Sequence, residues 1–127
     1  MGVLVKVESK AGLVRGAASQ AIEVGGAERT LIIGAVSQPG RTVASQLGHV
    51  YRHIDGVLEQ HGMQRNNVVS WECVCDPQVD DHAFYDVVMP AMARYFRDCE
   101  VKPVAANVSF ARLLEGRLIQ VSMLAMA

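Results

Sequence analysis

The sequence has few of the residues that stabilise small secreted or metal-dependent domains. Cysteine occurs three times in 127 residues, as Cys73, Cys75 and Cys99, and an odd number without secretory spacing argues against a disulfide framework. A chain of this length buries roughly 65–70% of its unfolded surface without such crosslinks. We therefore expect one domain over residues 1–127, with reduced thiols, no metal and no cofactor.

Long runs of one charge or of apolar residues are also absent. Twelve Lys and Arg residues face 13 Asp and Glu residues, for a formal net charge of −1, and nucleic-acid binding needs a clustered basic face instead. No apolar run approaches the ~20 residues of a bilayer span, and residues 1–10 lack the basic and then apolar order of a signal peptide. These absences predict a cytoplasmic protein that binds neither nucleic acid nor membranes.

What is present is a succession of short strands and two helices. Apolar residues recur at helical spacing from residue 41 to 61, with Gly62 as the cap. They recur again from residue 80 to 96, where Pro90 destabilises the helix by roughly 3 kcal/mol unless the helix kinks or begins late. The predicted strands are residues 3–8, 18–24, 30–33, 67–75, 104–112 and 117–125. Each helix stands between two strands, which predicts an α+β domain with a mixed six-stranded sheet and both helices on one face.

The face without helices needs another cover. Every second residue from 104 to 110 is apolar and suits the helix side, whereas residues 105, 107, 109 and 111 are small or polar. Met123, Leu124 and Met126 are too apolar for a free tail. We predict that copies of the chain bury this open face against one another, as cyclic oligomers do, and that pockets for a small molecule form between them.

Several stretches, in order, resemble the RidA/YjgF/YER057c/UK114 family. Residues 16–21 (G-A-A-S-Q-A) are similar to the family's G-P-Y-S-Q-A, and residues 31–35 are similar to its strand that ends in S-G. Residues 46–62, followed by residues 67–69, and residues 84–96 are similar to further stretches of the family, and residues 102–125 are similar to its last two strands. The resemblance covers residues 16 to 125 and implies a chorismate-mutase-like, YjgF-like fold assembled as a homotrimer with clefts between neighbouring subunits.

The resemblance also implies a chemistry from which this chain departs. Many members hydrolyse enamines or imines to a keto acid and ammonia. In them an Arg grips the substrate carboxylate, a Glu positions water and a Tyr lines the cleft. The matching positions here hold Ala105, Ser122 and Ala18. Because Ala cannot bind a carboxylate and a Ser hydroxyl is no general base near neutral pH, we expect a divergent active site that does not deaminate 2-aminoacrylate.

Other polar residues are candidates for a replacement site. Glu72 and Ser122 are the candidate catalytic residues, with Glu72 facing away from Trp71 and acting as the general base. The candidate substrate-binding residues are Asn107, Ser109, Gln120, Gly34, Ala105 and Ala18. Two alternatives stay open: the small polar residues line a wet subunit interface, and Glu72 forms an ion pair with Arg112 or Arg117 of a neighbour.

Three further groups have a structural interpretation beside a chemical one. Cys73 or Cys75 as a nucleophile needs a basic neighbour, and buried thiols are the favoured interpretation. His49 and His53, four residues apart, lack a third metal ligand and are expected to face solvent. Residues 80–82 (D-D-H) are expected to cap a helix. The directions of Tyr85 and Arg41 are not fixed by the sequence.

These observations lead to two main hypotheses. The first is a RidA-like enzyme, hydrolase, deaminase-like or lyase-like, that acts on an imine, an enamine or a related carbonyl-containing metabolite of one particular pathway. The second is a trimer of the same fold that binds a ligand or a partner without catalysis. The ribonuclease activity of some relatives is a third, weaker hypothesis, because the surface has no basic excess.

Overall fold

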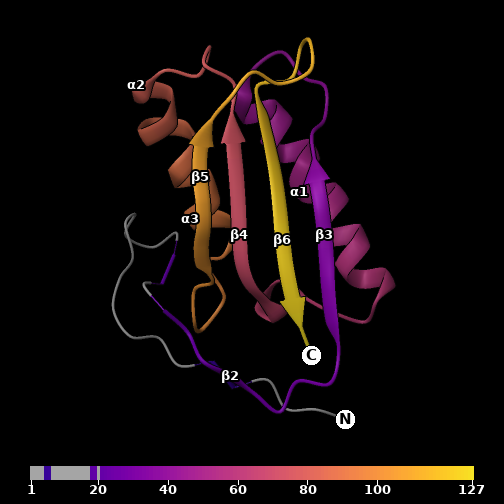
Figure 1. Ribbon diagram of the computed structural model, residues 1–127. Coiled ribbons are helices and arrows are strands. Elements are labelled where there is room, and N and C mark those ends of the chain that lie inside the picture. Colours follow the sequence, from indigo (N-terminus) through magenta and orange to yellow (C-terminus); the bar gives the residue numbers. More distant parts are fainter. Residues whose placement is uncertain (1–4, 7–17, 20) are drawn as a thin grey trace.

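A computed structural model describes residues 5–6, 18–19 and 21–127, and Figure 1 shows the long strands of the main sheet with helices packed behind them. The strands are β1 (Val5–Lys6), β2 (Val24–Gly25), β3 (Thr30–Val36), β4 (Val68–Cys75), β5 (Val104–Phe110) and β6 (Ile119–Met126). The helices are α1 (Val43–Gln60), the 3₁₀ turn η1 (Arg65–Asn67), α2 (Asp81–Ala83), the π-helical turn η2 (Phe84–Val88) and α3 (Met89–Tyr95).

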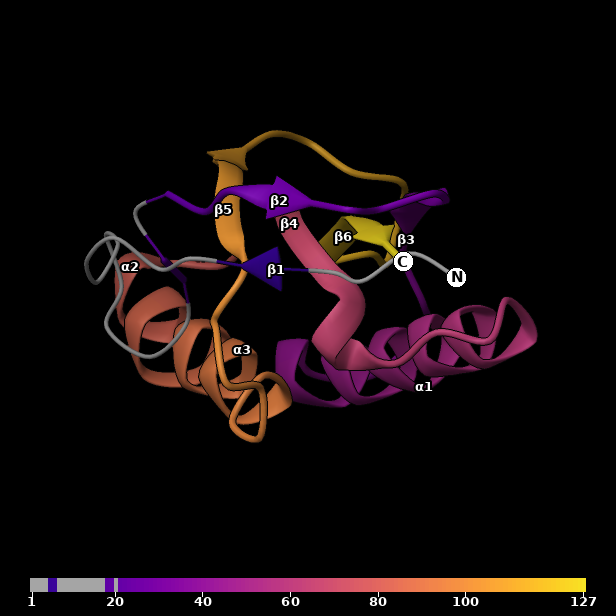
Figure 2. The same cartoon turned by 90° about the horizontal axis from the view of Figure 1, so that it is seen from below.

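The main sheet has the strand order β3-β6-β4-β5. β6 runs antiparallel to both β3 and β4, and β4 runs parallel to β5, so the sheet is mixed. The chain passes from β3 to β4 through α1, and from β4 to β5 through α2, η2 and α3. Both helical connections lie on the same side of the sheet (Figure 2). The predicted α+β architecture with helices on one face is therefore confirmed.

The core lies between this sheet and the helices. Trp71, Cys73 and Cys75 alternate along β4 toward the helices, and each is at most 1% exposed. From α1, the predicted stripe of residues at spacings of three and four packs against them, including the buried Leu47, Val50, Ile54 and Leu58. Removing such side chains from water provides roughly 1.5–3 kcal/mol each. The buried stripe fixes the side of the sheet on which α1 lies.

The second helical segment accommodates Pro90 without leaving a backbone hydrogen bond unmade. Across the wide π turn η2 the Met89 N–H donates to the Phe84 carbonyl, five residues back. Pro90 then falls in the first turn of α3, where a missing N–H leaves no hydrogen bond unmade. The Asp80 carboxylate accepts from the Ala83 N–H at 2.8 Å, so the predicted helix cap at residues 80–82 is confirmed.

The prediction of six strands in one sheet is wrong for the part of the chain that the structure describes. β1 and β2 pair only with each other, in a separate two-stranded sheet. Gly26 turns the chain at a φ of 72°, and the N–H groups of Glu28 and Arg29 both donate to the carbonyl of Ala127 beyond the end of β6. The chain thus bends around the end of the sheet before β3 begins. The remaining residues of the predicted strand at 3–8 lie outside the described residues.

One face of the main sheet has no helix over it (Figure 2). We call it the open face. Ile32 on β3 is 76% exposed there, and it is paired with Leu124 of β6. Within the described ranges, none of the helices has the length and apolarity that a membrane crossing requires.

Candidate functional site

The open face places Glu72 at the centre of a polar row across three strands. Glu72 of β4 is paired with Ser122 of β6 on one side and with Asn107 of β5 on the other. Paired residues point to the same face, with Cβ atoms about 4.5–5.5 Å apart. Beyond Ser122, a β-bulge on β3 carries Gly34. Four of the predicted site residues therefore come together from four strands.

A second row continues the polar surface. Val74 of β4 is paired with Gln120 of β6 and with Ser109 of β5. The side-chain amide of Asn107 donates to the Ser109 hydroxyl at 3.3 Å, which links the two rows. The predicted grouping of Asn107 with Ser109, and of Gln120 with Ser122, matches the faces that these residues occupy.

A hollow lies on this face beside the polar row. It has a volume of about 380 Å³ and is lined by Ile32, Gly34, Ser70, Glu72, Ser122 and Leu124, with Ile33, Trp71 and Met123 beneath. A volume near 300 Å³ or more accommodates a small metabolite. The hollow therefore has one apolar wall, from Ile32 and Leu124, and one polar wall, from Glu72 and Ser122.

Two predicted substrate-binding residues do not lie on this face. Ala105 is paired with Trp71 and packs against the core, because a bulge between Trp71 and Glu72 inserts Ala106 into β5. The bulge reverses the alternation: Val104, expected toward the helices, is paired with Ser70 on the open face. Ala18 is 3% exposed and belongs to the core cluster. Neither alanine is part of the polar row.

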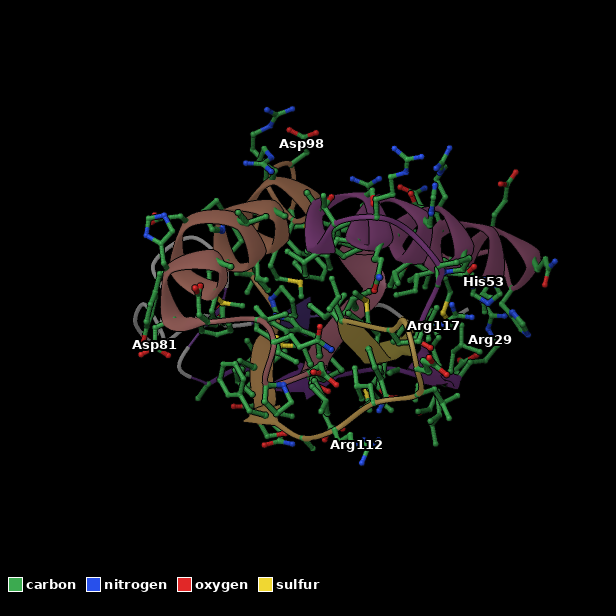
Figure 3. All side chains as sticks on the ribbon, turned by 90° about the horizontal axis from the view of Figure 1, so that it is seen from above. Arg29, His53, Asp81, Asp98, Arg112 and Arg117 are labelled. Carbon is green, nitrogen blue, oxygen red and sulfur yellow. The ribbon has the colours of Figure 1, made fainter. Side chains whose placement is uncertain are left out.

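The carboxylate of Glu72 is exposed in the single chain and is the charged group of the polar row. A carboxylate can accept a proton from water or from a ligand, and the two residues paired with Glu72 across the strands, Ser122 and Asn107, are polar and uncharged. Seen along the strands, Arg112 lies on the side of the sheet away from the helices, whereas Asp98 lies on the helix side (Figure 3). The ion pair of Glu72 with a neighbour's Arg112 or Arg117 stays a prediction.

The thiols of β4 are placed for packing and not for chemistry. Cys73 and Cys75 are both 0% exposed and belong to the core cluster. A hydrogen bond with Cys75, together with burial, raises the pKa of the Cys73 thiol far above its usual range, which keeps it protonated. The same hydrogen bond lowers the pKa of the Cys75 thiol. The burial of both side chains in the core supports their interpretation as structural thiols.

Within the described residues, the histidine pair on α1 has no third side chain beside it that would complete a metal site. His49 Nδ1 lies 2.8 Å from the carbonyl oxygen of Pro39, and His53 is exposed. In the described part of the chain, no three His, Cys, Asp or Glu side chains are grouped so that they would hold a metal ion.

A network on the helix side was not found from the sequence. Arg65 of η1 donates from Nε and Nη2 to the two carboxylate oxygens of Asp55 of α1, at 3.0 and 2.7 Å. The Tyr95 hydroxyl of α3 donates to Asp55 Oδ1 at 2.6 Å. The three residues are far apart in the chain and share no motif, so no sequence signal connects them.

The comparisons with known proteins agree on the fold. No protein-family model and no curated protein matches the chain. A protein of unknown function of the conserved Rid protein family from Yersinia pestis superimposes with a TM-score of 0.80 at 16% identity, over 96% of this chain and 98% of that one. A member of the YjgF/YER057c/UK114 family from Mycobacterium tuberculosis superimposes with a TM-score of 0.61 at 18% identity, over 86% of both chains.

A third solved structure has more of the sequence in common. A candidate endoribonuclease L-PSP from Entamoeba histolytica is 27% identical, with a TM-score of 0.65, and the match covers 98% of this chain and 100% of that one. The resemblance to Rid/YjgF proteins that the sequence motifs predict is thus confirmed as a structural match over nearly the full length. This chain has the YjgF-like fold.

Proposed function

We propose that this chain is a divergent member of the Rid/YjgF/YER057c/UK114 family, a cytoplasmic homotrimer that hydrolyses a small imine, enamine or related carbonyl-containing metabolite at the open face. The observation that carries the proposal is the polar row in which Glu72 stands between Ser122 and Asn107 beside a hollow of about 380 Å³. In the trimer, the neighbouring subunit would close this hollow into a cleft.

The proposed reaction uses Glu72 as a general base and then as a general acid. The Glu72 carboxylate takes a proton from water while the water oxygen bonds to the C=N carbon of the imine. The protonated carboxyl returns this proton to the nitrogen. The Glu72 carboxylate then takes the hydroxyl proton of the resulting carbinolamine as the C=O bond forms and passes it to the nitrogen, so that the C–N bond breaks and the nitrogen leaves as ammonia, or stays as the amine of the opened product where the imine is cyclic. Ser122 and Asn107 orient the substrate through hydrogen bonds.

The substrate is expected to differ from that of the 2-aminoacrylate deaminases. The position that corresponds to their carboxylate-gripping Arg is Ala105, which here also faces the core. The remaining groups of the polar row other than Glu72 are uncharged, and the opposite wall is formed by Ile32 and Leu124. These properties favour a neutral or largely apolar imine, including a cyclic one.

The test is a turnover assay for ammonia or carbonyl product with linear, aromatic and cyclic imines. A substrate should be found among the uncharged imines, and Glu72→Gln should lower kcat by about 10²–10⁴-fold. Glu59→Gln, which removes an exposed carboxylate from the helix side, is the matched control and should retain the wild-type rate. Equal rates for wild type and Glu72→Gln, or rapid ammonia release from freshly generated 2-aminoacrylate, would contradict the proposed site.

The alternative is a trimer that binds the same compounds without turning them over. It is favoured by the absence of a second ionisable group in the polar row, where the partners of Glu72 are Ser122 and Asn107. Under this alternative a compound raises the melting temperature of the protein, as any ligand of the native state does, while its own concentration stays constant. Thermal shift followed by product analysis on each stabilising compound separates the two functions.

A further inference from the structure

A second hollow lies on the opposite side of the molecule, between α1 and α3. It has a volume of about 350 Å³, and its lining comes from α1, η1 and α3. Figure 2 shows these helices on the side of the sheet away from the open face. We call this hollow the inter-helix groove. Nothing in the proposed reaction uses it.

The floor of the inter-helix groove is apolar because small residues meet aromatic rings there. Gly48 and Ala91 line it from the two helices, and a Cβ atom added at Gly48 would meet no atom within 4 Å. The rings of Tyr51 and Tyr95 stack at 4.3 Å between centroids. The Tyr51 hydroxyl donates to the sulfur of Met92 at 3.5 Å, so this hydroxyl is engaged within the helix pair, and Tyr51 lines the groove.

The charged groups of the groove leave an excess of positive charge. The carboxylate of Asp55 is fully engaged by Arg65 and Tyr95, so this acid and Arg65 balance each other. Arg52 and Arg94 also line the groove. Both are exposed, and within residues 21–127 and the short described segments before them neither guanidinium group has a hydrogen-bond or ion-pair partner. Among the described residues, these two guanidinium groups therefore border an apolar floor without an ion-pair or hydrogen-bond partner.

We propose that the inter-helix groove binds a small organic anion, one that carries carboxylate or phosphate groups on a flat, partly apolar body. The planar guanidinium groups of Arg52 and Arg94 hold such oxygens in paired hydrogen bonds, and the body rests on the Tyr51 ring. The volume of about 350 Å³ suits a metabolite of this size. This site is separate from the polar row of the open face and takes a ligand of opposite character.

The first experiment uses phthalate as the probe, with phthalamide as its uncharged analogue and inorganic phosphate as the anion without a ring. Calorimetric titration of the whole protein at low salt should detect phthalate and not phthalamide, with phosphate weaker than phthalate. Arg52→Ala and Arg94→Ala should each weaken phthalate about tenfold. Arg97→Ala, which removes an arginine of the helix side outside the groove lining, should leave affinity unchanged. Unchanged phthalate affinity in both Arg52→Ala and Arg94→Ala, or no phthalate binding at millimolar concentration, would overturn the proposal.

The second experiment fills the groove. Gly48→Leu places a side chain in the open space above α1 and should abolish phthalate binding. Gly56→Leu is the matched control, because it makes the same change in the same helix, also into open space, but outside the groove lining. Both variants should fold, because leucine is the better helix former, and thermal melting checks this. Glu72→Gln should bind phthalate normally. Loss of binding in Glu72→Gln but not in Gly48→Leu would place phthalate on the open face and overturn the groove site.

Discussion

Gln46 shows how a single buried polar side chain joins distant parts of this fold. It is 0% exposed, yet its amide nitrogen donates to the carbonyls of Gly40 and Gly116, at 3.0 and 2.9 Å. Its amide oxygen accepts from the Leu118 N–H at 2.8 Å. Two donors and one acceptor are thus all satisfied, which is what a buried amide requires. Gln46 thereby holds the loop before α1 and the loop before β6 together.

Gln46→Leu should lower the free energy of unfolding by about 2–4 kcal/mol, since backbone groups of both loops are left without hydrogen bonds inside the protein. Gln46→Glu should also destabilise the fold at neutral pH, because a carboxylate cannot donate to two carbonyls. Gln60→Leu, at the exposed end of α1, is the control and should change stability by no more than about 0.5 kcal/mol. Urea denaturation measures all three. A Gln46→Leu variant as stable as Gln60→Leu would show that the loops find other partners.

The alternation of single residues along the strands explains which site residues could be placed from the sequence and which could not. Alternation along β4 puts Glu72 opposite to Trp71, and this part of the prediction is correct. On β5 the alternation is interrupted by the extra residue Ala106, so Ala105 faces the core instead of the open face. A bulge depends on the hydrogen bonds of the neighbouring strand and leaves no periodic trace among small residues such as those at 104–107.

At the scale of elements, helix period and strand alternation are strong signals, and the connections between elements are weak ones. The period of α1 from Val43 to Leu58 was readable because its buried residues repeat at three and four. The π turn before Pro90 could not be predicted from the sequence, because its position depends on where the folded helix tolerates the missing N–H of the proline. The tie among α1, η1 and α3 through Asp55, Arg65 and Tyr95 requires the folded chain.

The hydrogen-bond network of Asp55, Arg65 and Tyr95 predicts that the stability of the fold depends on pH. Burial by itself raises the pKa of Asp55, but hydrogen bonds from Arg65 and Tyr95 outweigh it and lower the pKa below its usual range. A carboxyl with a lowered pKa stabilises the fold above its unfolded pKa of about 3.9 and loses that contribution as the pH falls through the folded value. Wild type should therefore melt above Asp55→Asn near neutral pH, and the difference should close at acidic pH.

Melting temperatures of both proteins between pH 7 and pH 2 test this. Asp98→Asn removes an exposed carboxylate from the helix side and is the matched control, because its only ion pair in the described residues is the long 3.8 Å contact with Arg97. Its melting temperature should follow that of wild type. A difference between wild type and Asp55→Asn that widens toward acid would reverse the assigned sign.

At the scale of the whole molecule, two helices cover one side of a four-stranded sheet and leave the other to be covered by something else. The open face carries Ile32 at 76% exposure next to Leu124, and Glu72 stands beyond them. A stable protein rarely leaves such apolar area in water. The proposed trimer buries it, and the proposed hydrolytic cleft depends on that trimer because the hollow beside Glu72 is open in one chain.

Ile32→Glu should therefore dissociate the trimer, since symmetry places a buried carboxylate in every copy of the interface. Gln60→Glu introduces the same charge at the end of α1 on the helix side and should leave the assembly intact. Light scattering at micromolar concentration should report about three times the chain mass of 13.8 kDa for wild type and Gln60→Glu, and less for Ile32→Glu. A wild-type particle of single-chain mass would remove the cleft and the hydrolysis proposed for it. The inter-helix groove lies within one chain, so phthalate binding at Arg52 and Arg94 would survive that result.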